Sequence, residues 1–237
     1  MRTIKYGESG VVVDLFTPSH GRMAVMTYRR SGSASNNRRR TRPTYLMPLS
    51  LVEMECNLAD RQRMPRATNM TSYHTFTSLH SQPIKSTIVM FVAEFLTKVL
   101  REETPDPLLY SYIEQSLLWL DTSTSQYSNF HLVFLMRMTH FIGIEPPSHA
   151  PSTPLCYFDL MGSEYTDNQP LHQHFLPPEE TRRLRYILHM NYDNMHLYPL
   201  SHNQRRRILE IINTYYSLHL PSFGELKSLE VLRDIFA

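Results

Sequence analysis

The sequence predicts a protein of two domains, a small basic β-barrel followed by an α-helical domain. In the first third of the chain, short runs of alternating apolar residues are separated by turn residues, which is typical of strands. From about residue 83, apolar residues recur every three or four positions, as in helices. The charge changes in the same region, because residues 1–72 hold 12 Lys and Arg against 5 Asp and Glu, whereas residues 73–237 hold 12 against 17. We therefore expect a domain boundary near residue 72.

Three strands are expected in the basic part, over residues 11–16, 22–27 and 46–56. The segments 7–10, 18–21 and 31–37 are rich in Gly, Pro, Ser and Asn, the residues that form turns. Short consecutive antiparallel strands must hide their edges, and closure into a small barrel does so.

Six helices are expected after the boundary. Asp106 and Pro107 form a typical helix start, Ser201 and Gln204 have the spacing of a capping box, and Gly143 ends the third helix. The segment 145–176, which includes residues 156–165, is expected to be a non-helical insert. The predicted helices cover residues 88–99, 106–120, 129–142, 178–190, 201–215 and 225–236.

The 237-residue chain offers little for catalysis or for metal binding. Its two cysteines, Cys56 and Cys156, lie far apart, and Cys156 with His172 and His174 does not have the spacing of a zinc signature. Nucleophile elbows, glycine-rich phosphate loops and paired carboxylates in a convincing context are not found. We therefore predict a non-enzymatic protein with no metal and no cofactor, and interpret both histidines as surface or interface residues.

Membrane insertion and secretion are not predicted either. A helix that spans a bilayer needs roughly 18–20 apolar residues, and no run in the sequence approaches that length. The N-terminal residues lack the apolar core of a signal peptide. The expected location is the cytoplasm, in association with the nucleoid if DNA is the partner.

The concentration of positive charge in the first 72 residues indicates a polyanionic partner, because neutralised phosphates release counterions and so favour binding. Tyr6, Tyr28 and Tyr45 are candidates for base stacking, although tyrosines in a small barrel are as often part of the core. A solvated charged face or a disordered basic loop would explain the same residues. The candidate DNA-binding residues are Lys5, Arg22, Arg29, Arg30, Arg38, Arg39, Arg40, Arg42, Arg63 and Arg66.

The predicted helix over residues 129–142 is apolar around most of its circumference, which favours a buried central helix. A less favoured alternative is that one side lines a groove for an apolar peptide with an acidic end. The groove would then contain Phe134, Arg137, Met138 and Phe141. Arg205 to Arg207 are interpreted as a solvated face, with an extension of a DNA path as the alternative.

Three segments are similar to the bacterial RecO family of recombination mediators. The opening KYGESGVVVDLFTPSHGRM resembles the first strands of that family, and YYSLHLPSFGELKSLEVLRDIF resembles its C-terminal signature. The helix that ends at Gly143, followed by Pro146 and CYFDLMGSEY, resembles the middle. The order and spacing of these segments cover nearly the whole chain.

The resemblance implies an N-terminal OB-fold barrel, an α-helical domain and no catalytic site. It also implies binding of single- and double-stranded DNA, annealing of complementary strands, docking on the C-terminal tail of the single-stranded-DNA-binding protein, and joint action with RecR to load RecA. The tail-binding groove would lie in the helical domain, which gives weight to the groove around Phe134.

The chain departs from the family pattern at two places. Many relatives have a four-cysteine zinc module where this chain has only Cys156, so the resemblance argues against zinc. Relatives usually have about ten more residues before Arg2, so the first barrel strand is expected to be missing and one barrel edge exposed. Two rival functions remain open: a protein-binding adaptor whose basic module meets an acidic partner, and a nuclease or other DNA-modifying enzyme.

Overall fold

The computed structural model describes residues 1–7, 10–28, 44–58, 64–100, 104–148 and 156–235. The chain divides into two compact units, Met1–Thr122 and Ser123–Ala237. The first unit contains the strands of the basic segment together with two helices, and the second contains four helices and a small sheet. The change from strands to helices lies where the sequence predicts it, between residues 72 and 83. As a boundary between domains, residue 72 stays a prediction.

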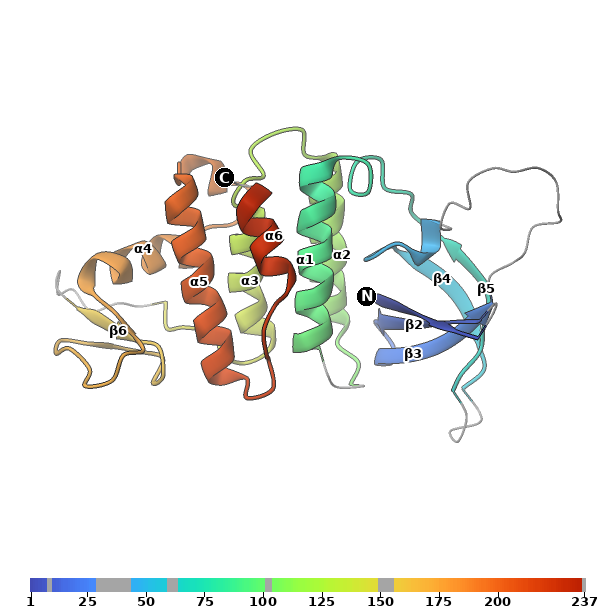
Figure 1. Ribbon diagram of the computed structural model, residues 1–237, viewed down its shortest axis with the longest axis horizontal. Helices are drawn as coiled ribbons and strands as arrows, with labels where there is room; N and C mark the ends of the chain where they lie inside the picture. Colours follow the sequence, from blue (N-terminus) through green and yellow to red (C-terminus); the bar gives the residue numbers. More distant parts are fainter. Residues whose placement is uncertain (8–9, 29–43, 59–63, 101–103, 149–155, 236–237) are drawn as a thin grey trace. The chain divides into compact units, whose positions relative to one another are not determined.

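The first unit begins with a three-stranded antiparallel sheet, which is drawn in blue in Figure 1. The strands are β1 (Arg2–Tyr6), β2 (Gly10–Thr17) and β3 (Gly21–Tyr28), in the order β1-β2-β3. Alternate residues of β2 point to one face, where Val11, Val13 and Leu15 are buried with Val25 of β3. This face forms the β core with Leu46, Ala67 and Met70.

A second sheet pairs β4 (Val52–Cys56) with β5 (Ala67–Ser72), with a register shift between Glu53 and Glu55. A parallel bridge between Met26 and Arg66 and a hydrogen bond of 2.8 Å from Met26 N to Pro65 O link β3 to the start of β5. Within the described ranges, strand pairing does not close the two sheets into a barrel, so the predicted closed barrel is not confirmed.

The strand predicted over residues 46–56 is wrong in its first half. Thr44–Leu46 forms a short 3₁₀ helix, and the strand begins only at Val52. Pro48 has no N–H to donate to a ladder, and Leu49 has a φ of 57°, in the left-handed region. The extended conformation is therefore interrupted between the two elements.

The first unit also contains α1 (Pro83–Val99) and α2 (Pro107–Thr122). As predicted, α2 begins at Pro107, and Oδ1 of Asp106 accepts a hydrogen bond of 2.9 Å from Leu109 N. The end of α2 is tied to the start of α1, because Nζ of Lys85 donates to the backbone oxygen of Asp121 over 2.9 Å. Lys85 is only 1% exposed, so this polar contact lies in the interior.

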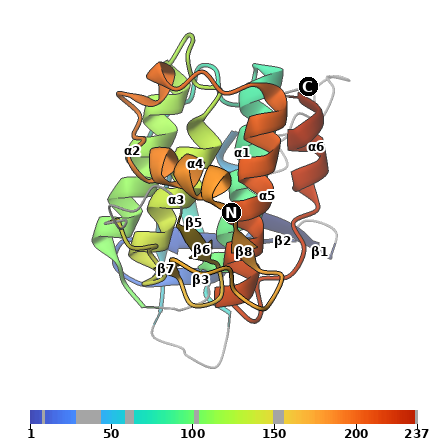
Figure 2. The same ribbon diagram turned by 90° about the vertical axis from the view of Figure 1, so that its left-hand side faces the viewer.

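The second unit has α3 (Phe130–Phe141) and α5 (His202–His219) in contact, with α4 (Pro178–Leu188) against α3, as Figure 2 shows. A small sheet of β6 (Tyr157–Asp159), β7 (Glu164–Thr166) and β8 (Phe175–Leu176) packs on α4. These three short strands lie in the predicted non-helical insert. The short 3₁₀ helix η2 (Met195–Leu197) lies between α4 and α5, and α6 (Ser228–Ile235) follows α5.

The predicted helix signals of the second unit are confirmed. The Ser201 side chain accepts from Gln204 N, and the Gln204 side chain accepts from Ser201 N, which is a full capping box at the start of α5. Gly143 follows α3 with a φ of 74°, a conformation that glycine adopts without strain. The structure contains, within its described ranges, no helix that is long and apolar enough to cross a membrane.

Candidate nucleic-acid interface

The outer face of the sheet β1-β2-β3 has two exposed tyrosines at one end. Tyr6 of β1 and Tyr28 of β3 both pair with Gly10 of β2, so the three residues form one row across the sheet. Directly paired residues of antiparallel strands point to the same face, and here that face is opposite the β core. Tyr6 is 62% exposed and Tyr28 is 50% exposed. Two phenol rings are therefore presented to solvent on either side of Gly10.

Gly10, between the two tyrosines in this row, is buried. A Cβ atom at this position would lie 2.5 Å from the backbone oxygen of Tyr6, so only glycine fits without a shift of the hairpin. The next row of the same face contains Ile4, Val12 and Met26, of which Ile4 is 47% exposed. The row of tyrosines thus borders an apolar strip.

Arg66 supplies a positive charge beside this face. Its guanidinium carbon lies 6.0 Å from the centroid of the Tyr28 ring, within the range of a cation–π contact. The side chain of Arg66 is exposed. Lys5 is also exposed, but it pairs with the buried Val11, so its side chain starts from the opposite face. Of the predicted DNA-binding residues, Arg66 therefore lies beside Tyr28, whereas the side chain of Lys5 starts from the other face of the sheet.

Arg22 requires a correction, because its side chain is engaged within the protein. It donates to both carboxylate oxygens of Asp14, over 3.0 and 2.7 Å, and to the backbone oxygens of Thr97 and Leu100, over 2.8 and 2.6 Å. These carbonyls belong to the C-terminal end of α1, where a cation is favourable. Arg22 joins the sheet to the helix and has little donor capacity left for a phosphate.

Tyr45, a candidate for base stacking, is half-buried against the β core and is part of the packing there.

The other predicted DNA-binding residues lie outside the residues that the structure describes. They are Arg29, Arg30, Arg38, Arg39, Arg40, Arg42 and Arg63.

A second feature of the first unit was not predicted. A cavity of about 670 Å³ is lined by β2, by the segment 49–58 and by α2. At its edge the Tyr73 hydroxyl donates to a carboxylate oxygen of Glu114 and lies 3.1 Å from the Tyr110 hydroxyl. Burial, followed by these two hydrogen bonds, raises the pKa of Tyr73. The only sequence signal was the spacing of Tyr110 and Glu114 on one face of α2.

The predicted protein-binding groove on α3 is mostly interior. Phe134 and Met138 are 0% exposed, so the core interpretation is correct for both, and neither can touch a partner directly. Arg137 is exposed and Phe141 is half-buried. The outward edge of α3 therefore consists of a cation next to a partly accessible ring.

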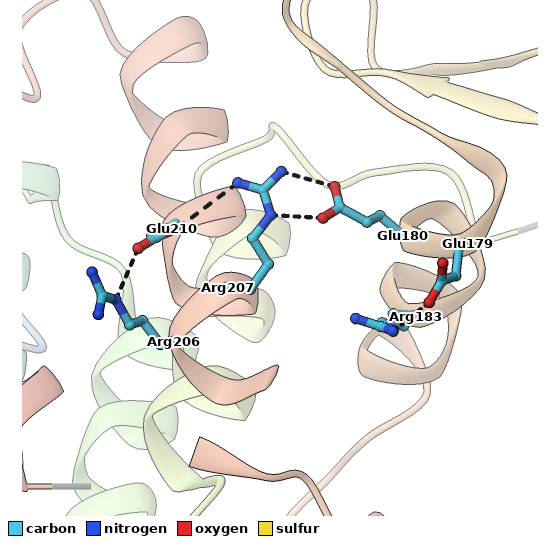
Figure 3. A network of polar contacts seen from close by, with 6 residues as sticks. All are labelled: Glu179, Glu180, Arg183, Arg206, Arg207 and Glu210. Carbon is cyan, nitrogen blue, oxygen red and sulfur yellow. Dashed lines mark hydrogen bonds and ion pairs between the residues drawn. The ribbon is translucent and has the colours of Figure 1, made fainter. Parts of the chain in front are cut away.

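Two arginines at the start of α5, Arg206 and Arg207, pair with acidic residues of the same unit, as Figure 3 shows. Arg207 donates to both carboxylate oxygens of Glu180 on α4, over 2.7 and 2.9 Å, and Arg206 pairs with Glu210 over 3.3 Å. Arg205 is partly buried and donates to the backbone oxygen of Leu200. These contacts favour a structural role over an extension of a DNA path.

The histidines of the insert make polar contacts within it. Nε2 of His172 lies 3.1 Å from Oδ2 of Asp159, and His174 N donates to Nδ1 of His172 over 3.2 Å. Cys156 is buried. The described part of the chain contains no group of three or more His, Cys, Asp and Glu side chains that could hold a metal ion.

Comparison with known proteins identifies the family. The sequence model described as "Recombination protein O C terminal" matches residues 80–230, more than half of the chain. "DNA repair protein RecO" of Phocaeicola vulgatus is 39% identical over 238 residues, covering 100% of this chain and 96% of that protein. The protein of the same name from Bacteroides fragilis is 38% identical over 241 residues, with the same coverage. That of Flavobacterium psychrophilum is 30% identical and covers 99% of this chain and 95% of its own length.

The chain combines a β-sheet segment that exposes aromatic and basic residues with a C-terminal region that matches a recombination-protein family. This combination places the protein in the class of recombination and DNA repair proteins. Within this class, the chain belongs to the RecO family. The resemblance seen in its first, middle and last segments is thereby confirmed.

Proposed function

We propose that this protein is a mediator of DNA repair and homologous recombination. It binds single- and double-stranded DNA through its first 72 residues, anneals complementary strands, and acts with RecR to load RecA on DNA coated by the single-stranded-DNA-binding protein. The observation that carries this proposal is the concentration of positive charge in the segment that precedes the family-matched region. The names of the full-length relatives support it.

We also propose that the first module is a barrel of the OB type. Its support is a meander of three antiparallel strands, a second strand pair with a register shift, and the bridge from Met26 to Arg66. Such barrels bind nucleic acids on a strand face and in the adjoining loops. The phosphate-binding residues are Lys5, Arg29, Arg30, Arg38, Arg39, Arg40, Arg42, Arg63 and Arg66, while Arg22 keeps its structural role.

Reversal of three charges tests the DNA assignment. We expect the variant Arg38→Glu, Arg39→Glu, Arg40→Glu to bind DNA of every sequence more weakly. Each lost phosphate contact on single-stranded DNA removes about 0.7 from the slope of log affinity against log salt, so three lost contacts reduce it by about 2. Fluorescence anisotropy of labelled single-stranded DNA across a salt series measures both effects.

The matched control is Arg182→Glu, Arg183→Glu, Arg185→Glu on α4, which changes the net charge by the same amount. Unchanged affinity of the first variant at moderate salt, or an equal loss in the control, would contradict the assignment. Heparin as competitor separates the mediator from the adaptor, because an adaptor for acidic partners would show no preference for DNA over another polyanion.

For the protein partner, we propose that the edge of α3 formed by Arg137 and Phe141 contacts the acidic C-terminal tail of the single-stranded-DNA-binding protein. Arg137 is exposed and supplies a cation for the terminal carboxylate, while Phe141 offers apolar surface. We expect Arg137→Glu to weaken binding of a labelled tail peptide roughly tenfold or more, since a charge-assisted hydrogen bond becomes a repulsion. Arg182→Glu, which makes the same change of charge at an exposed position on α4, is the control for the position of the charge. Equal loss in both variants would show a nonspecific charge effect.

A further inference from the structure

We infer that the cavity of the first unit is a docking site for an extended segment of a partner protein, and that this segment is apolar on one face and carries a lysine. The carboxylate of Glu114 on α2 binds the ammonium group of that lysine. The site takes a polypeptide, and it is distinct from the residues proposed to bind phosphate.

The cavity is large and apolar enough to receive several side chains. Its volume of about 670 Å³ lies within the range of about 300–1,000 Å³ that is typical of ligand sites. Leu96 of α1 and Ile113 and Leu117 of α2 line it, and all three are buried. Glu53 and Tyr73 line it as well and are exposed, so the cavity opens to solvent.

The charge of the cavity wall is opposite to that of the surrounding segment. Glu53 and Glu114 line the cavity, and within the described ranges no Lys or Arg side chain does. The first 72 residues as a whole have an excess of basic residues. Because like charges repel and opposite charges attract across an interface, this wall disfavours phosphate and favours a cation.

Aromatic residues surround the carboxylate of Glu114. The Tyr73 hydroxyl donates to it and lies 3.1 Å from the Tyr110 hydroxyl. The ring of Tyr110 in turn packs on Phe16, with a distance of 6.3 Å between ring centroids and an interplanar angle of 30°. A carboxylate beside aromatic rings binds an organic ammonium group through an ion pair and cation–π contacts. A lysine reaches such a group through an apolar stem, which suits the apolar part of the wall.

The edge of β4 indicates that the occupant is an extended polypeptide. Val52 and Met54 pack against the β core, whereas Glu53 is exposed, yet all three line the cavity. Since neighbouring residues of a strand point to opposite faces, the cavity runs along the strand edge. In the part of the chain that the structure describes, β4 pairs with β5 alone. An extended peptide can therefore add to the other edge through its backbone and direct alternate side chains into the cavity.

The test measures binding of a fluorescein-labelled, acetylated and amidated peptide, Thr-Ile-Thr-Lys-Thr-Ile-Thr, to the full-length protein by anisotropy. Two further peptides have norleucine or glutamate in place of the lysine. We expect the lysine peptide to bind roughly tenfold or more tightly than the norleucine peptide, since a hydrogen bond to a charged group is lost in the latter. The glutamate peptide should bind most weakly, because the wall repels it.

The variant Glu114→Gln locates the cation. It should lower the affinity of the lysine peptide to that of the norleucine peptide and leave the norleucine peptide unaffected, which also shows that the cavity is intact. Glu55→Gln is the matched control, because Glu55 lies on β4, is exposed and does not line the cavity. This control should bind all three peptides like the wild type.

Methylation of the peptide backbone tests the addition to β4. Alternate N–H groups of a strand point to the same edge, so two lysine peptides are methylated at one or the other alternate set of amides. We expect one of them to lose binding and the other to keep it. Equal affinity of the lysine and norleucine peptides, equal behaviour of the two methylated peptides, or an equal loss in Glu55→Gln would overturn the inference. Single-stranded DNA binding by Glu114→Gln should match the wild type, so the proposed DNA function is tested separately.

Discussion

Replacement of Asp121 by Ala is expected to lower the free energy of unfolding by about 3–5 kcal/mol, the range observed when one member of a buried ionic network is removed. The carboxylate of Asp121 accepts hydrogen bonds from the backbone N–H groups of Thr77, Ser78 and Leu79, over 2.9, 2.7 and 2.9 Å. It also accepts bonds from the hydroxyls of Thr77 and Ser78. The variant leaves the backbone N–H groups of the buried residues Ser78 and Leu79 without their acceptor.

The buried Lys85 increases the cost. Its Nζ donates to the Ser78 hydroxyl over 2.7 Å, and its positive charge is stabilised by the nearby Asp121. Burial lowers the pKa of Lys85, and Asp121 opposes that shift. Without the carboxylate, an ammonium group with 1% exposure loses the negative charge that opposes the effect of burial on its pKa.

The same network makes stability depend on pH in acid. Burial alone would raise the pKa of Asp121, but the hydrogen bonds from the backbone of residues 77–79 and from the Ser78 side chain lower it to about 2. The folded pKa lies below the ordinary value of 3.8 for an aspartate, so the folded state holds this proton less tightly than the unfolded chain does. The stabilisation is complete above about pH 4 and is lost as the pH falls toward 2.

Urea denaturation followed by circular dichroism at pH 7, and again in steps from pH 5 to pH 2, measures both effects. Asp193→Asn, at an exposed position, is the control and should change stability by less than about 0.5 kcal/mol. The variant Lys85→Met removes the cation and keeps the stem, so a double-mutant cycle with Asp121→Ala gives the coupling between the two residues. A loss below 1 kcal/mol for Asp121→Ala would show that the network contributes little.

Removal of the Arg22 side chain is expected to lower stability by roughly 2–3 kcal/mol without changing the salt dependence of DNA binding. Arg22 is bidentate to Asp14 and reaches two carbonyls at the end of α1, and hydrogen bonds that involve a charged group contribute about 1.5–3 kcal/mol. The side chain of Asp14 is only 11% exposed, so Arg22→Ala leaves a nearly buried carboxylate unpaired. Lysine cannot replace the guanidinium, since it lacks the planar arrangement of donors.

Arg66→Ala is the matched variant, because it removes the same type of side chain from an exposed position. We expect it to change stability by less than about 0.5 kcal/mol and to weaken single-strand binding, the reverse of the result for Arg22→Ala. Thermal unfolding and anisotropy on both variants measure the two properties. A reduced salt slope for folded Arg22→Ala would show that Arg22 contacts phosphate after all.

Much of the element order could be read from the sequence, because the signals are local. The alternation of Val11, Val13 and Leu15 predicts β2, and the capping residues Asp106 and Ser201 predict the starts of α2 and α5, where the structure has them. The run from Leu46 to Cys56 was assigned to a single strand because its apolar residues suit one. The left-handed conformation of Leu49 interrupts that strand, and such a conformation in a leucine has no sequence signal.

The candidate site was predicted only as a set of residue types. Arg22 and Arg66 are equivalent in the sequence as basic residues of the same module. The structure separates them, because Asp14 and the end of α1 come to Arg22 while Arg66 lies beside Tyr28. Tyr6 and Tyr45 were likewise equal candidates, and their burial distinguishes a solvent-facing ring from one packed on the core.

Three features were determined by the sequence alone: the change from strands to helices, the asymmetry of charge and the membership in the RecO family. They depend on periodicity, composition and similarity of segments, which are properties of the linear sequence. The tertiary structure decided which cations are engaged, which aromatic rings face solvent, and that Gly10 lies between Tyr6 and Tyr28. It also brought Asp121 to the backbone of residues 77–79, more than 40 positions away in the chain. Such relations depend on strand register and helix packing, which bring together residues that no local pattern connects.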